Sequence, residues 1–173
     1  NPLFASLLED DAAPLADHLL LHQYMAGEAN IEQGDQSSSM FGVTEGLLEV
    51  LVTRPRKEEQ LRVARLDPGS IFGEMSLLVG EPRSATVRAI VDSMVYEVRR
   101  DSIVQLLQSR PEIGAILSEV IARRNVETSS MIETATNAER QAAIEGTARS
   151  LFARMKSIFG SALRSFDPDK IAG

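Results

Sequence analysis

Apolar positions recur with a helical period at both ends of the chain and with a strand-like texture between them. Over residues 3–21, leucines and one phenylalanine follow helical spacing, with an interruption at Pro14. From His22 to Arg99, short runs rich in Val, Ile, Leu and Phe are separated by glycines, as in antiparallel strands joined by turns. We therefore predict two short helices over 3–21, and strands over 22–26, 29–32, 39–45, 47–53, 60–66, 85–90 and 93–99.

The helical period returns after Arg99. Asp101 is a suitable N-cap for a helix that carries an apolar stripe, and Pro111 suits the first turn of a second helix that runs to residue 126. Over 127–139 the stripe weakens into Thr, Ser, Asn and Ala, which is compatible with a helix or a hinge. An amphipathic helix is expected over 144–163. The layout predicts an α+β fold: an antiparallel β-roll or jelly roll flanked by helices, with an extra helical tail.

Composition narrows the possible functions. The 173 residues carry 18 Lys and Arg against 25 Asp and Glu, a net charge of −7, so we predict no nucleic-acid partner. The absence of cysteine excludes disulfides, thiol catalysis and Cys-ligated zinc, and is compatible with the cytoplasmic location that we expect. The sequence contains no window of 18 apolar residues, so we expect no membrane-spanning segment in it. The sequence starts at Asn1, so we expect a piece of a longer protein.

The segment FGEMSLLVGEPRSATV, residues 72–87, concentrates the candidate chemistry. Gly73 precedes about one turn of helix, whose free N–H groups favour an anion, and Arg83 offers a planar charged fork to phosphate oxygens. Glu74 beside such an anion would need a donor on the same ligand, for which a sugar hydroxyl is suitable. Each feature also has an ordinary explanation: such an Arg is more often part of a surface ion pair with Glu74 or Glu81, and glycines between strands are usually turns.

This segment resembles, almost position for position, the phosphate-binding cassette of the cyclic nucleotide-binding domain family. The resemblance implies that Glu74 binds the ribose 2′-hydroxyl and that Arg83 binds the exocyclic oxygens of a cyclic phosphate. It implies further ligand contacts through the amides near Gly73, Met75, Ser76 and Ala85, and the Ser84 hydroxyl is itself a possible donor to the ligand. Gly42 departs from the family, in which an aliphatic residue is common at that position. No cofactor is implied beyond the nucleotide ligand.

The resemblance also implies a domain over 1–126, with a β-roll over 22–99 and lid helices over 101–126, followed by a helical tail or linker over 127–173. In the family the last helix closes over the purine, so Arg123 or Arg124 is a candidate to stack on the base, or each is a solvated charge. At the position of Ser84, family members with Ala often bind cAMP and those with Thr often bind cGMP, and Ser is intermediate between the two. We favour cAMP because related bacterial channel domains with Ser at this position favour it.

We therefore predict a sensor that binds cAMP, or cGMP as the alternative, and moves its lid helix to control an attached effector, expected to be a membrane channel. The tail segment 151–160 resembles tails of bacterial mechanosensitive-type channels. The rival hypothesis is the ligand-binding half of a catabolite-activator-type transcription regulator without its DNA-binding module; kinase regulatory subunits usually carry two such domains. We expect that the protein is not an enzyme. We also expect no metal site, since His18 and His22 lack a third ligand.

The tail carries basic residues near the polar side of its amphipathic helix: Arg149, Arg154, Lys156 and Arg164. Such a helix is expected to pack on its own fold or to form a homo-oligomer, and the alternative is an acidic membrane surface or a partner.

Overall fold

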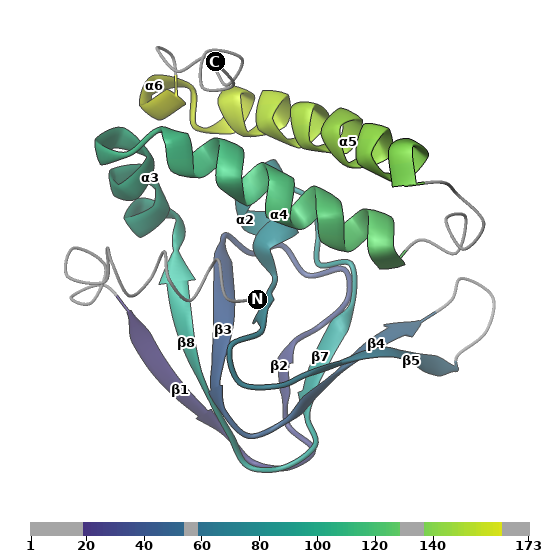
Figure 1. Ribbon diagram of the computed structural model, residues 1–173. Helices are drawn as coiled ribbons and strands as arrows, with labels where there is room; N and C mark the ends of the chain where they lie inside the picture. The colour runs from purple at the N-terminus through teal and green to yellow at the C-terminus, as the bar shows by residue number, and fades with distance from the viewer. Residues whose placement is uncertain (1–18, 54–58, 129–136, 164–173) are drawn as a thin grey trace. The chain divides into compact units, whose positions relative to one another are not determined.

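The computed structural model describes residues 19–53, 59–128 and 137–163. The chain divides into two compact units between Ile103 and Val104. The first unit is mainly strands (Figure 1). Its strands are β1 (Leu20–Tyr24), β2 (Ala29–Ile31), β3 (Ser39–Glu45), β4 (Leu48–Thr53), β5 (Gln60–Leu66), β6 (Ile71–Phe72), β7 (Thr86–Ala89) and β8 (Ser93–Arg99), with the short helix α2 (Glu74–Val79) after β6.

The strands form two four-stranded antiparallel sheets, in the orders β1-β8-β3-β6 and β2-β7-β4-β5. Alternate residues of β3 point inward, and apolar side chains from the inner faces of both sheets share one core. The core consists of Phe41, Val43, Leu48, Phe72, Val87 and Val95, with Tyr24, Ile31, Val50 and Leu66 packed against it. This confirms the predicted α+β roll.

The helical unit shows where the tail packs. Helix α3 (Arg100–Ser109) crosses the boundary between the units and is followed by α4 (Glu112–Thr128), α5 (Asn137–Ile158) and α6 (Gly160–Leu163). Helices α4 and α5 lie side by side (Figure 1). The Ser118 hydroxyl of α4 lies 3.2 Å from the Met155 sulfur of α5, and a Cβ on Gly114 would be 3.2 Å from Phe152. The tail therefore packs on helix α4 of its own chain.

Most predicted elements agree with the structure to within two residues, and three predictions need correction. Leu20 and Leu21 do not end a helix; they lie in β1, which pairs with β8, and both are exposed, so their spacing did not mark a buried face. Asp101 is not the N-cap of α3 but lies in its first turn, because the helix begins at Arg100. Helix α5 begins at Asn137, well before residue 144. The part of the predicted helices that falls on residues 3–18 lies outside the described residues.

No helix among the described residues is both long and apolar enough to cross a membrane. The predicted domain boundary after residue 126 stays a prediction.

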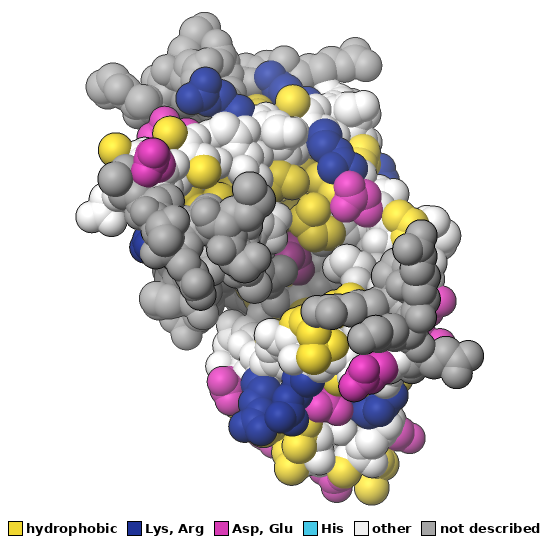
Figure 2. All heavy atoms as spheres, turned by 90° about the vertical axis from the view of Figure 1, so that its right-hand side faces the viewer, with side chains coloured by type: hydrophobic (Ala, Val, Ile, Leu, Met, Phe, Trp, Pro, Cys, Tyr) yellow, Lys and Arg dark blue, Asp and Glu magenta, His cyan; other side chains and the backbone are white. Residues whose placement is uncertain are grey.

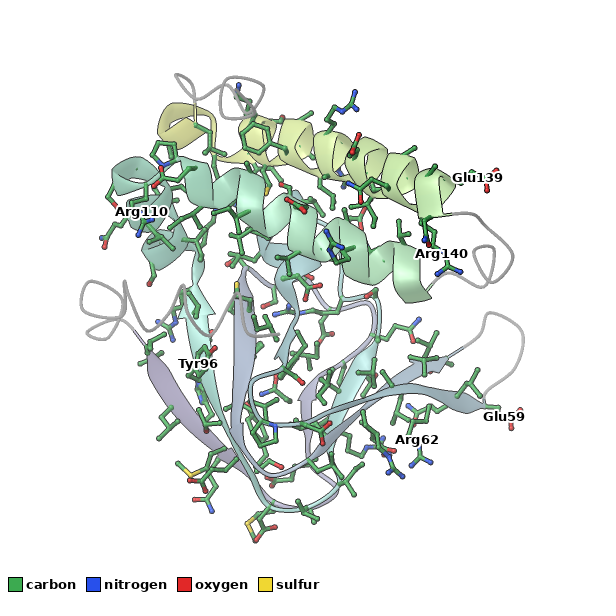
Figure 3. The ribbon with its side chains drawn as sticks, in the orientation of Figure 1. Glu59, Arg62, Tyr96, Arg110, Glu139 and Arg140 are labelled. Atoms are coloured by element: carbon green, nitrogen blue, oxygen red, sulfur yellow. The ribbon has the colours of Figure 1, made fainter. Side chains whose placement is uncertain are left out.

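Gly42, the departure from the family pattern, has a packing reason. It pairs with Tyr96 across β3 and β8, and Tyr96 is labelled on β8 in Figure 3. A Cβ at Gly42 would lie 2.0 Å from Cζ of the Tyr96 ring, so the ring occupies the space that any other residue would need. Burial there raises the pKa of the Tyr96 phenol to about 12. The glycine and the tyrosine are thus complementary in shape.

We expect Gly42→Ala to displace the Tyr96 ring toward solvent. Overpacking of this kind typically costs about 1–3 kcal/mol of folding stability, and the phenol pKa should fall back toward about 10 as the ring regains water. Denaturant unfolding and the alkaline tyrosinate absorbance titration measure the two effects. Gly146→Ala is the matched control, because a Cβ there meets nothing within 4 Å. A Gly42→Ala chain as stable as the wild type, with an unchanged titration, would contradict this account.

Candidate functional site

The cassette segment forms a turn, a short helix and a second turn between β6 and β7. Gly73 and Gly80 flank α2 with φ angles of 74° and 71°, a left-handed conformation that glycine adopts without steric cost. The chain then reaches Arg83 and enters β7 at Thr86. The two glycines thus reverse the chain twice and bring residues 73 and 83 together.

Arg83 is the centre of the site. Its side chain is buried, with 3% of the residue exposed. Nη1 donates a hydrogen bond to the Gly73 carbonyl at 2.6 Å, and Nη2 donates to the Ser37 hydroxyl at 2.7 Å and to the Ser39 hydroxyl at 3.4 Å. The guanidinium carbon lies 5.6 Å from the centre of the Phe41 ring. Because Arg83 is buried, the alternative explanation of a surface ion pair does not apply to it.

Among the residues that the structure describes, no carboxylate contacts the charge of Arg83 directly. Within the described part of the chain, no acidic oxygen forms an ion pair with it, and its buried Nε has no hydrogen-bond partner. Burial lowers the pKa of the guanidinium, and the more distant charges of Glu74, Asp35 and Glu97 oppose that shift. Because arginine stays protonated in proteins, the result is a buried cation with donor capacity left over. Such a group is suited to bind an anion.

The other predicted cassette residues have different surroundings. Glu74, the first residue of α2, is 4% exposed, and its charge acts on Arg83. The Ser76 hydroxyl is buried without a hydrogen-bond partner among the described residues. Met75 and Ala85 are half-buried, and Ser84 is exposed. The structure thus brings Gly73, Glu74 and Arg83 together, while the role of each as a ligand contact stays a prediction.

Three residues around Arg83 were not predicted from the sequence: Ser37, Ser39 and Phe41. The first two are its hydroxyl acceptors, and Phe41 presents its ring to the guanidinium while stacking on Phe72 at 5.3 Å. Three consecutive serines at the entry of a strand are a weak signal by themselves. Only the pairing of β3 with β6 places them beside the cassette.

Arg123 and Arg124 belong to α4, in the other compact unit. Arg123 is exposed and pairs with Glu119 at 3.1 Å, one helical turn earlier. The Arg124 side chain lies outside the described residues. Their proposed contact with a base therefore stays a prediction.

His22 has an ordinary structural partner. Its Nε2 lies 2.9 Å from Glu97, whereas His18 is outside the described residues.

On the face drawn in Figure 2, Lys and Arg side chains lie in small groups beside Asp and Glu side chains.

Comparison with known proteins identifies the family. The model of the cyclic nucleotide-binding domain family matches residues 21–110, just over half of the chain. The chain belongs to this family. The matched range contains both sheets, α2, Arg83 and the serines that contact it.

Relatives of this cyclic nucleotide-binding domain come from more than one regulatory class. It is 43% identical over 88 residues to a cAMP-dependent protein kinase regulatory subunit of Mycosarcoma maydis, which covers 51% of this chain but only 16% of that protein. A solved N-terminal domain of a transcriptional regulator from Streptomyces coelicolor is 29% identical, with a TM-score of 0.61, covering 75% of this chain and 91% of that one.

The catabolite activator protein of Thermus thermophilus shares the fold, with a TM-score of 0.67 and 22% identity, over 93% of this chain and 87% of that one.

We expect Gly73→Ala to disturb both the turn and the placement of Arg83. The residue has φ 74°, and a Cβ there would lie 2.3 Å from Arg83 Nη1. Left-handed strain alone costs about 1–2 kcal/mol. Gly69→Ala is the matched control, since Gly69 has φ 85° and open space around its Cβ position. Both variants should lose stability in thermal unfolding, but only Gly73→Ala should also weaken cyclic nucleotide binding. Equal nucleotide affinity in both variants would contradict the placement of Arg83.

Proposed function

We propose that this domain binds a cyclic mononucleotide through Arg83 and the start of α2, with cAMP favoured over cGMP. The observation that carries the proposal is the buried Arg83 guanidinium, which has no carboxylate partner in the described chain and an unpartnered Nε. Binding of a singly charged phosphodiester would stabilise a cation in this state, because charge-assisted hydrogen bonds are stronger where water is excluded.

Glu74 and Ser76 support a nucleotide over a bare anion. Glu74 is buried at the start of α2, where a carboxylate can accept from a ribose hydroxyl, and the buried Ser76 hydroxyl has no partner among the described residues. Together with the amides near Gly73, Met75 and Ala85, these groups offer acceptors to a sugar and donors to a phosphate on the same ligand. We infer from this that the domain is a binding module and not an enzyme.

Two features support cAMP. The kinase regulatory subunit that is 43% identical is named as cAMP-dependent. Ser84, exposed after Arg83, differs from the threonine that accompanies cGMP in the family, and related bacterial channel domains with Ser at this position favour cAMP.

We propose that occupancy is transmitted by α4, with Arg123 or Arg124 contacting the base, and that the effector is a membrane channel whose cytoplasmic part contains this domain. Differential affinity for two lid positions would supply coupling of about 1–3 kcal/mol. The alternative effector is a DNA-binding module of a transcription regulator, which the similarity to the Streptomyces coelicolor domain supports.

Arg83→Lys tests the phosphate contact. It keeps the charge but removes the planar fork, so cAMP affinity should fall by about tenfold to a hundredfold. Isothermal titration calorimetry of the wild type and the variant with cAMP and cGMP measures this. Arg99→Lys is the control, because Arg99 is exposed and lies 3.7 Å from Glu97. An Arg83→Lys chain that is folded by circular dichroism and binds cAMP as tightly as the wild type would refute the proposal.

Ser84 variants test the nucleotide preference. Ser84→Thr keeps the hydroxyl and adds only a methyl group, so it should change both affinities by less than about threefold, whereas Ser84→Ala removes the hydroxyl and should weaken cGMP binding by about threefold to tenfold, the usual range for one net hydrogen bond. Ser84→Ala should leave cAMP affinity unchanged. Competition of both nucleotides against a fluorescent cyclic nucleotide measures both affinities. A wild type that already prefers cGMP, with no response to either substitution, would overturn the preference for cAMP.

A further inference from the structure

Three consecutive serines, Ser37 to Ser39, lead into β3. Two of them contact Arg83 through their hydroxyls and the third, Ser38, does not. Because successive side chains of an extended segment alternate in direction, Ser37 and Ser39 face the same way and Ser38 faces the other. The hydroxyls of Ser37 and Ser39 accept hydrogen bonds from Arg83 Nη2 and lie 3.3 Å from each other. The Ser38 hydroxyl has no hydrogen-bond partner among the described residues; only the Ser38 carbonyl is used, by the Arg100 amide at 3.1 Å.

The same loop also holds the backbone of Arg83. The Gly34 amide donates to the Arg83 carbonyl at 2.8 Å, and the Arg83 amide donates to the Asp35 carbonyl at 2.9 Å. One connection, residues 34–39, therefore fixes both the main chain and the guanidinium of Arg83. The direction in which the guanidinium points is set by this loop and by the Gly73 carbonyl.

The acceptors that hold the guanidinium are uncharged. They are the Gly73 carbonyl and the two serine hydroxyls, and a carboxylate in their place would neutralise the cation directly. Each hydroxyl that accepts from Arg83 also keeps its own proton to donate. The arrangement orients the cation while leaving its charge available to another anion.

We propose that Ser37 and Ser39 are positioning residues, which aim the Arg83 guanidinium at the phosphate of the ligand through uncharged acceptors. This inference rests on the proposed function, since the phosphate is that of the cyclic nucleotide. It predicts that the two hydroxyls contribute to the affinity for the phosphate and not to the affinity for the nucleoside part of the ligand.

The binding test compares Ser37→Ala/Ser39→Ala with Ser38→Ala, using cAMP and adenosine as competing ligands. The double variant should bind cAMP about tenfold or more weakly, as expected for loss of hydrogen bonds to a charged group, with adenosine affinity unchanged. Ser38→Ala should match the wild type for both ligands, and Ser37→Thr/Ser39→Thr, which retains the hydroxyls, should recover cAMP affinity. Equal losses for cAMP and adenosine would mean a merely structural role and would overturn the proposal, as would an unchanged cAMP affinity.

A second measurement needs no ligand. In thermal unfolding, Ser37→Ala/Ser39→Ala should lower Tm by about 5 °C relative to Ser38→Ala, because buried N–H groups of Arg83 lose their acceptors. In an Arg83→Met background the same double substitution should leave Tm unchanged, since no charge then needs those acceptors. If the wild type binds no cyclic nucleotide but this coupling is present, the proposed function fails while the contact to Arg83 stands. If the coupling is absent, the positioning role fails whatever the ligand result.

Discussion

The site depends on one unusual burial: the charge of Arg83 lies inside the protein, and no carboxylate of the described residues is in contact with it. Removing an ion from water costs several kcal/mol even after relaxation, and a hydrogen-bonded carboxylate is the usual way to offset that cost. Arg83 has instead a carbonyl, two hydroxyls and the face of an aromatic ring. Its Nε remains unpartnered within the described chain. A bound phosphate would supply both the missing charge and the missing acceptor.

The rest of the first unit can be understood as a rigid support for that cation. Phe41 and Phe72 stack where β3 pairs with β6, and Phe41 faces both the shared core and Arg83. Gly73 leaves the space that Arg83 Nη1 occupies. Since these contacts come from three separate segments of the chain, near residues 37–41, 72–73 and 83, the geometry of the guanidinium depends on the folded roll. Binding is thereby linked to the folded state of the whole roll.

What such binding controls depends on the protein around it. The match to the kinase regulatory subunit covers 16% of that relative, whereas the transcriptional regulator domain is covered almost entirely. One ligand-binding fold therefore occurs in proteins with different outputs, as expected when function resides in sites and attachments and not in the fold itself. In this chain, α5 packs on α4 through contacts such as Ser118 with Met155, so the helix that follows the roll already has an intramolecular partner.

The sequence by itself determined the roll, since strand periodicity and turn glycines are local properties that predicted nearly every strand. It also determined the cassette, because Gly73, Glu74 and Arg83 lie in one continuous segment, 72–87. It misplaced Leu20 and Leu21, whose spacing suited a helix until pairing with β8 decided otherwise. Only the tertiary structure decided that Arg83 is buried, that Ser37 and Ser39 hold it, and that Tyr96 needs a glycine at position 42. The contacts of Arg83 with the two serines and of Gly42 with Tyr96 join residues 44 to 54 positions apart, which no local pattern encodes.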